Sequence, residues 1–176
     1  MNYHNITKAD MLNGEGLRVV LWVSGCEHNC KGCHNPQTHS YNSGIPFNEE
    51  AKDELFKELE KQYISGITFS GGDPLALNNR LPVLSLAMEV KEKFPNKTIW
   101  CYTGYKYEQL INDDSSPTLT ELLGLFDVLV DGKYMKCLAD TKLPYRGSTN
   151  QRLIDVKKSL ASSQIILLDV RNSDME

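Results

Sequence analysis

The chain has 176 residues, of which 40% are hydrophobic and 24% charged, and its formal net charge is -4. This length suits one domain with a sizeable core, so a single domain over residues 1–176 is expected. Its acidic and basic residues are interspersed without a basic stripe, which argues against a nucleic-acid partner. No apolar run approaches the ~20 residues of a membrane span, and the N-terminus lacks the features of a secretory leader, so we expect a cytoplasmic protein with no membrane partner.

Short β-branched apolar runs alternate with longer amphipathic stretches along the chain. This pattern is typical of βα units around a largely parallel sheet and predicts an α/β fold. Asn48 is a good N-cap, and two glutamates in the following turn favour a helix there. In chain order, the sequence predicts strands at residues 17–23, 66–70, 98–102 and 127–130, and helices at residues 48–62, 83–94 and 119–125.

The last part of the chain is less regular. Residues 153–156 and 165–170 have strand character, whereas residues 157–162 fit either a short helix or a solvated connection. An exposed turn is predicted at residues 112–117. Each of the four predicted strands before residue 131 ends in a loop that contains glycine. Because ligands of parallel α/β folds bind beyond the carboxyl ends of the strands, these four loops are expected to share one site.

Three cysteines follow the first predicted strand in the spacing C-x3-C-x2-C: Cys26, Cys30 and Cys33. Thiolates suit iron-sulfur clusters and zinc, and the clustering of cysteines in an intracellular chain favours metal binding over a disulfide framework. A [4Fe-4S] cluster ordinarily takes four thiolates, so three leave one iron without a protein ligand. An open coordination position is typical of a catalytic metal site rather than of a structural one.

A structural zinc site is the alternative reading of the same loop. The three cysteines together with His28 or His34 would make an ordinary Cys3His ligand set. A usual zinc module pairs two ligand couples separated by a dozen or more residues, and no second couple is evident here. Cys101 and Cys137 are predicted to be buried small residues, although either would become a candidate fourth ligand if folding brought it near.

A second motif, Gly71-Gly72-Asp73-Pro74, follows the second predicted strand. Two glycines allow the backbone to approach a ligand closely or to adopt positive φ. Exposed backbone groups beside an acidic side chain would suit an ammonium group. The motif therefore indicates a binding loop for an amino-acid moiety, with an ordinary turn as the simpler alternative.

The cysteine spacing resembles the signature of the radical S-adenosylmethionine enzymes. The resemblance implies that Cys26, Cys30 and Cys33 hold one [4Fe-4S] cluster and that S-adenosylmethionine occupies the open iron. His34 stands where that superfamily commonly has an aromatic residue near the adenine, and the Gly-Gly-Asp loop matches the loop that binds the methionyl amine. The cofactor-binding residues implied in this way are Gly32, Cys33, His34, Ser70, Gly71, Gly72 and Asp73.

Over about residues 1–152 the chain resembles the activating proteins of anaerobic ribonucleoside-triphosphate reductases, with residues 153–176 left as a C-terminal extension. Two positions depart from the family pattern: Glu15, where proline is frequent, and His34. The matching segments are Met1-Asn2-Tyr3, Asn13-Gly14-Glu15-Gly16, Ser24-Gly25-Cys26, Ser70-Gly71-Gly72-Asp73-Pro74-Leu75, Ile99-Trp100 with Thr103-Gly104-Tyr105, Val130-Asp131-Gly132-Lys133, and Arg146-Gly147-Ser148-Thr149-Asn150-Gln151.

This resemblance implies a shortened, incomplete (β/α) barrel of the radical S-adenosylmethionine type and an oxidoreductase that activates a glycyl-radical enzyme. The implied reaction is reductive cleavage of S-adenosylmethionine to a 5'-deoxyadenosyl radical, which removes a hydrogen atom from a glycine of the anaerobic reductase. An external low-potential electron donor is then required. No acid, base or nucleophile is expected from the chain, because the cofactors supply the chemistry.

Two further readings stay open beside this one. The first is an activator of another glycyl-radical enzyme, such as pyruvate formate-lyase, or a small radical enzyme that acts on a metabolite. The second is a zinc-binding interaction module. Asp131 and Lys133 fit either a cofactor or partner role or an ordinary turn, and Arg146 fits either docking of the reductase or a solvated surface position.

Overall fold

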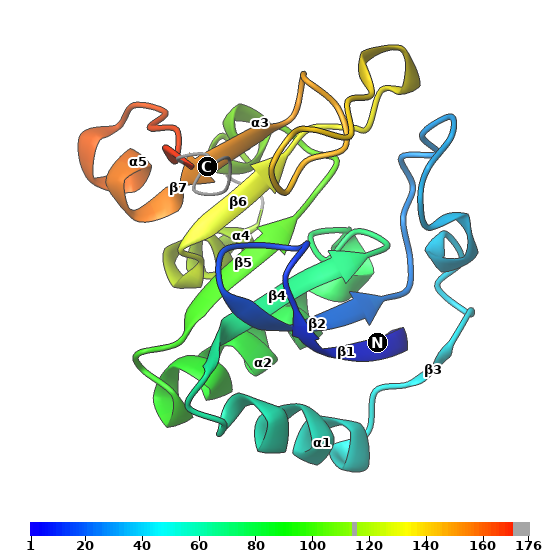
Figure 1. Cartoon of the computed structure of the whole chain (residues 1–176), viewed down its shortest axis with the longest axis vertical. Helices are drawn as coiled ribbons and strands as arrows, with labels where there is room; N and C mark the ends of the chain where they lie inside the picture. Colours follow the sequence, from blue (N-terminus) through cyan, green and yellow to red (C-terminus); the bar gives the residue numbers. More distant parts are fainter. Residues whose placement is uncertain (114–115, 171–176) are drawn as a thin grey trace.

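The computed structural model describes residues 1–113 and 116–170, and its centre is one seven-stranded sheet with the strand order β3-β1-β2-β4-β5-β6-β7 (Figure 1). The central strands β2, β4, β5 and β6 are parallel, and antiparallel pairs add β1, β3 and β7 at the sides. The predicted α/β class and the parallel centre of the sheet are thus confirmed. The strands are β1 Asn2–Asp10, β2 Leu17–Val23, β3 Ile45–Pro46, β4 Ile64–Gly71, β5 Thr98–Tyr102, β6 Val128–Asp131 and β7 Arg152–Asp155.

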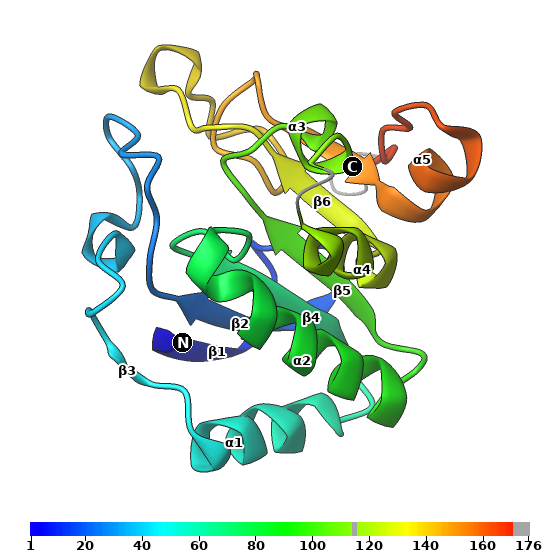
Figure 2. The ribbon, with the colours of Figure 1, turned by 180° about the vertical axis from the view of Figure 1, so that it is seen from behind.

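The helices that cover the sheet are gathered on one of its faces. Seen from behind, α2 and α4 lie in front of the strands, and α1 runs below them (Figure 2). Alternate residues of β2, such as Val19 and Leu21, are fully buried in the main core with Leu55 of α1. The helices are α1 Glu49–Leu59, α2 Leu77–Lys93, α3 Tyr107–Ile111, α4 Pro117–Leu125 and α5 Val156–Ser162.

The predicted cap of the first helix is present, because the Asn48 side chain accepts a hydrogen bond of 3.0 Å from the backbone N–H of Ala51. The helix ends at Leu59, a little before the predicted end near residue 62. The second helix begins at Leu77, earlier than the predicted residue 83. These differences are confined to the ends of helices, where the apolar periodicity gives the weakest signal.

The other face of the sheet carries a smaller apolar cluster, which includes Trp100 and Val130, and a buried arginine. Arg18, in β2 near the amino ends of the parallel strands, is fully buried. Its side chain donates five hydrogen bonds, and its guanidinium lies 5.2 Å from the Trp100 ring centroid. The five acceptors are Thr68 Oγ1 at 2.7 Å, Thr98 Oγ1 at 2.9 Å, and the backbone oxygens of Glu15 at 3.2 Å, Ile67 at 2.7 Å and Thr98 at 3.0 Å. Burial lowers the pKa of Arg18 to about 10, so the group stays charged at neutral pH.

Three segments differ from the prediction or resolve a choice that the prediction left open. The strand β1 has no counterpart in the prediction, since only Tyr3 and Ile6 of its residues are buried and the period-two signal is lost. Residues 157–162 belong to helix α5, which settles the choice left open. Residues 165–170, expected to be a strand, contribute only the isolated bridge between Ile154 and Leu167.

Cys101 is fully buried as predicted, whereas Cys137 is exposed, so its predicted burial is wrong. Cys137 lies in a short 3-10 helix at the surface, outside the sheet that buries Cys101. Of the turn predicted at residues 112–117, residues 114 and 115 lie outside the described part of the chain. Among the residues that are described, no helix has both the length and the apolar character needed to cross a membrane.

Candidate functional site

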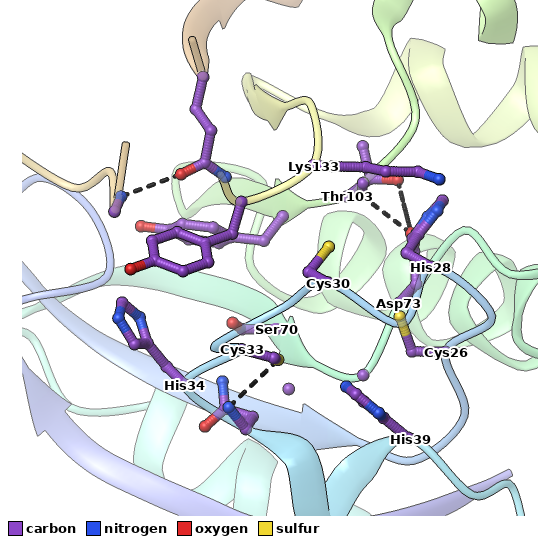
Figure 3. A pocket seen from close by; sticks show the side chains of 18 of the residues that line it. Cys26, His28, Cys30, Cys33, His34, His39, Ser70, Asp73, Thr103 and Lys133 are labelled. Atoms are coloured by element: carbon purple, nitrogen blue, oxygen red, sulfur yellow. Dashed lines mark hydrogen bonds and ion pairs between the residues drawn. The ribbon is translucent and has the colours of Figure 1, made fainter. Parts of the chain in front are cut away.

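The loops that follow β2, β4, β5 and β6 meet around one cavity of about 260 Å³ (Figure 3). Each loop contributes to its wall: Cys26 from the first, Gly72 and Asp73 from the second, Thr103 from the third and Lys133 from the fourth, with Ser70 from the end of β4. The four glycine-bearing loops therefore lie together around one cavity, as expected, and binding of a ligand there stays a prediction. All the residues predicted to bind a cluster or cofactor line this cavity except Gly32, which is exposed at the surface.

The cysteine loop leaves β2 and places three free thiols on the cavity wall. Its fold is local: the backbone N–H of Cys33 donates to the oxygen of Cys30 at 3.1 Å, and Asn35 N–H donates to the Cys33 sulfur at 3.3 Å. Cys26, Cys30 and Cys33 are all partly exposed and are joined in no disulfide. Neither Cys101 nor Cys137 is among the lining residues.

The surroundings of two of these thiols, Cys26 and Cys30, favour the protonated form. Burial raises the pKa of Cys26 to about 11, and burial likewise raises the pKa of Cys30. A metal ligand must be deprotonated, so binding of a soft metal here displaces protons. Within the described residues, no three Cys, His, Asp or Glu side chains converge on a point that would hold a single metal ion. The donor set on this wall, three soft thiols, suits an iron-sulfur cluster or another soft metal centre.

The carboxylate of Asp73 joins three of the loops. It is 1% exposed and accepts hydrogen bonds from His28 Nε2 at 2.6 Å, from the Gly104 N–H at 3.0 Å and from the Leu75 N–H at 2.8 Å. The Thr103 hydroxyl lies 3.0 Å from both carboxylate oxygens. His28, the second residue after Cys26, thereby ties the cysteine loop to the glycine loop. The prediction that Asp73 takes an ammonium group stays a prediction.

The backbone of the glycine loop is fixed directly onto the cysteine loop. Gly72 N–H donates to the oxygen of Val23 at 2.7 Å, and Asp73 N–H donates to the oxygen of Gly25 at 2.7 Å. Gly71 has φ +98°, and a Cβ on Gly72 would lie 2.5 Å from the Gly25 oxygen. Only glycine fits both positions, so the motif serves this close approach of two loops.

The remaining candidate residues divide between framework and cavity. Asp131 is buried and accepts from the Tyr107 N–H at 2.8 Å and from the Arg152 guanidinium, which makes it part of the framework. Lys133 is exposed at the cavity rim (Figure 3). Arg146 is half-buried and donates to the oxygen of Gln151 at 3.3 Å, so the reading as a freely solvated arginine is wrong.

His34 lies on the cavity wall with its ring centroid 4.7 Å from that of Tyr134. His39, which the sequence did not single out, also lines the cavity. The position of His28 against Asp73 was likewise not foreseen, because the two residues are 45 positions apart and neither motif indicates the other. The signal that the sequence offers is a histidine within the cysteine loop, and there it also fits a zinc ligand.

Comparison with known proteins matches residues 12–154 to the family of the 4Fe-4S single cluster domain. Similar curated proteins carry the name anaerobic ribonucleoside-triphosphate reductase-activating protein. The one from Enterobacteria phage T4 is 46% identical over 153 residues, which cover 87% of this chain and 93% of that protein. The ones from Vibrio cholerae and Escherichia coli K12 are 44% and 41% identical, each covering 86% of this chain and 96% of the relative.

Proposed function

The chain belongs to the family of anaerobic ribonucleoside-triphosphate reductase-activating proteins, and on that premise we propose that it generates a glycyl radical on such a reductase. The observation that carries the proposal is the single cavity in which three free thiols adjoin the Gly-Gly-Asp loop. The match to a 4Fe-4S domain favours an iron-sulfur cluster over a structural zinc ion as the group that those thiols hold.

The chemistry that a bound [4Fe-4S] cluster would supply here is the one-electron reductive cleavage of S-adenosylmethionine to methionine and a 5'-deoxyadenosyl radical, which would take a hydrogen atom from a glycine Cα of the reductase. In our proposal Cys26, Cys30 and Cys33 hold three of the irons and leave the fourth for S-adenosylmethionine. An external low-potential donor supplies the electron. The chain itself binds, orients and excludes water, and no side chain acts as an acid, base or nucleophile.

S-adenosylmethionine is assigned to the wall formed by Ser70, Gly71, Gly72 and His34. The Ser70 hydroxyl and the backbone of the two glycines offer polar groups to the methionyl end, and the exposed ring of His34 offers a flat surface to the adenine. Asp73 serves this wall by fixing the loop, because its carboxylate oxygens already accept hydrogen bonds from the chain's own donors.

We further propose that the open sheet, with helices α1, α2 and α4 on one face, is the shortened barrel of the radical S-adenosylmethionine type. An incomplete barrel leaves a side of the site accessible to a large substrate. The reductase, a protein whose glycine must reach the cavity, is such a substrate.

The test mixes the anaerobically reconstituted and reduced chain with S-adenosylmethionine and an anaerobic ribonucleoside-triphosphate reductase. We expect a glycyl radical signal in electron paramagnetic resonance that requires all three components, together with 5'-deoxyadenosine in the product. Pyruvate formate-lyase in place of the reductase is the control partner, and a signal there alone would favour the other activator class. A colourless protein with one zinc and no iron or sulfide would contradict both enzyme readings.

A further inference from the structure

The backbone around His39 places this residue beside the first cysteine. After Cys33 the chain makes one turn of 3-10 helix, Pro36–Thr38, and returns along the end of β2. Gly25 N–H donates to the oxygen of Thr38 at 2.7 Å, and Cys26 N–H donates to the oxygen of His39 at 2.9 Å. These two hydrogen bonds fix the position of the His39 backbone relative to Cys26.

The side chain of His39 lines the cavity, and Figure 3 shows its ring pointing between Cys26 and Cys33. Its Nε2 atom is buried and has no hydrogen-bond partner among the described residues. Other histidine rings of the chain do have one: His28 Nε2 contacts Asp73, and His4 Nε2 lies 2.9 Å from Ser43 Oγ. A buried polar atom without a partner is uncommon and destabilising, so it calls for a partner that the protein itself does not supply.

We propose that His39 donates a hydrogen bond from Nε2–H to a sulfur atom of the [4Fe-4S] cluster, and that this bond raises the reduction potential of the cluster. The inference rests on the proposed function, since it needs the cluster held by the three cysteines. Cluster sulfides and cysteine thiolates are the acceptors that this cavity would contain. Coordination of iron by the ring would close the position that S-adenosylmethionine needs, so donation is the role compatible with the chemistry.

The direction of the effect follows from charge. The reduced cluster carries one more negative charge than the oxidised cluster, and hydrogen bonds to a more negative acceptor are stronger. The bond from His39 therefore stabilises the reduced form, and hydrogen bonds to the sulfurs are one of the determinants of cluster potential. His39 thus eases electron uptake from the external donor without touching S-adenosylmethionine.

The test compares two substitutions in the reconstituted full chain. His39→Phe keeps a flat ring and removes the donor, whereas His39→Gln removes the ring and keeps an N–H donor. We expect His39→Phe to retain full iron and sulfide while its reduced-to-oxidised ratio at a given potential falls about tenfold, equivalent to a midpoint ~59 mV lower for a one-electron couple. His39→Gln should recover most of this loss, and His4→Phe, a histidine change outside the cavity, should leave the midpoint unchanged.

The midpoint is read from a redox titration followed by electron paramagnetic resonance, with iron and sulfide counted in each sample. An unchanged midpoint in His39→Phe at full iron content overturns the inference, and so does loss of one iron per cluster, which would make His39 a ligand. If His39→Phe folds poorly by circular dichroism, the smaller His39→Leu takes its place with the same expected fall. A wild-type chain that assembles no iron overturns the proposed function itself, so the two failures are distinguishable.

Discussion

The two ends of the parallel strands carry buried polar groups of opposite kinds. At the amino ends Arg18 uses all five of its N–H donors on acceptors of the chain itself. At the carboxyl ends Asp73 is equally well satisfied, but beside it lie three free thiols and the Nε2 atom of His39, which has no partner among the described residues. Arg18 is thus satisfied by the chain itself, whereas the carboxyl ends present groups that an added ligand could use, as we propose.

Both networks join segments that are distant in sequence. Arg18 reaches Thr68 across 50 positions and Thr98 across 80, and Asp73 reaches His28 across 45. Each network therefore ties neighbouring parallel strands or their loops together. The two ends differ in which polar groups remain without a partner among the described residues. Substitutions at the amino ends should therefore lower stability, and substitutions of the thiols at the carboxyl ends should remove iron.

The largest expected effect concerns the three cysteines at the carboxyl ends of the strands. Cys26→Ala, Cys30→Ala or Cys33→Ala should each abolish cluster assembly and cleavage of S-adenosylmethionine, because two thiolates do not replace three. Cys101→Ala and Cys137→Ala are the matched controls and should retain iron, since neither residue lines the cavity. Iron, sulfide and 5'-deoxyadenosine are measured for all five variants, and loss of iron in the Cys101 variant would refute the three-ligand assignment.

At the amino ends of the strands, substitution of Arg18 should lower stability without removing iron. Arg18→Leu leaves the hydroxyls of Thr68 and Thr98 and buried backbone oxygens without their donor, and we expect it to lower the free energy of unfolding by about 3 kcal/mol. The folded fraction should bind as much iron per chain as the wild type. Arg18→Lys, which keeps the charge but not the planar fork, should recover only part of the stability. Urea unfolding and iron content are the measurements, and iron loss without destabilisation would break the comparison.

Asp73→Asn should lower both the stability and the affinity for S-adenosylmethionine, because Asp73 holds three loops together and also lines the cavity. The amide cannot accept from all of its present donors, and hydrogen bonds to charged groups contribute about 1.5–3 kcal/mol, so we expect a loss of about 2 kcal/mol. The affinity for S-adenosylmethionine should fall as well, measured by calorimetry on the reconstituted chain. The matched control is Asp10→Asn, at a half-buried side chain whose Oδ1 accepts from the backbone N–H groups of Leu12 and Asn13, both at 2.8 Å. The asparagine oxygen can still accept both bonds, so the cost should be less than about 0.5 kcal/mol, and an equal cost at both positions would count against a special role for Asp73.

The smallest expected effect lies at the rim of the carboxyl end, in the ion pair of Glu108 with Arg152. The Arg152 guanidinium hydrogen-bonds the carboxylate and lowers the pKa of Glu108 to about 2. A lowered folded-state pKa contributes stability above the unfolded value, ~4.3, and this contribution is lost as pH falls toward 2. Since the side chain of Glu108 is 47% exposed, solvent screening limits the contribution to less than about 1 kcal/mol.

The measurement is the difference in unfolding free energy between the wild type and Glu108→Gln. It should be constant from pH 7 to about 5 and disappear at lower pH. A difference that grew on acidification would show that the pair is not formed.

Much of the fold was predictable because its strands and helix ends are marked by short sequence patterns. The apolar runs of β2, β4, β5 and β6 and the cap at Asn48 need no knowledge of distant residues. The edge strand β1 was missed because Tyr3 and Ile6 alone face the core, and the strand at residues 165–170 was overestimated because the chain passes β7 with a single bridge.

The two motifs of the candidate site could also be found from the sequence, because each is defined within a few residues. The structure brings both motifs to one cavity, and their ligands stay predictions. The contact of His28 with Asp73 depends on the packing of loops from different strands, which no local pattern encodes. The same holds for His39 Nε2, which is buried without a partner in the described part of the chain.

The cavity is made from loops of four strands, and this has a consequence for the order of events after synthesis. The walls that surround its thiols come together only once β2, β4, β5 and β6 have paired, and contacts between distant segments form late in folding. Zinc-finger peptides, by contrast, fold only when the metal binds. We therefore expect the newly made chain to accumulate as a folded, colourless protein, and its maturation to wait for the delivery of iron and sulfide.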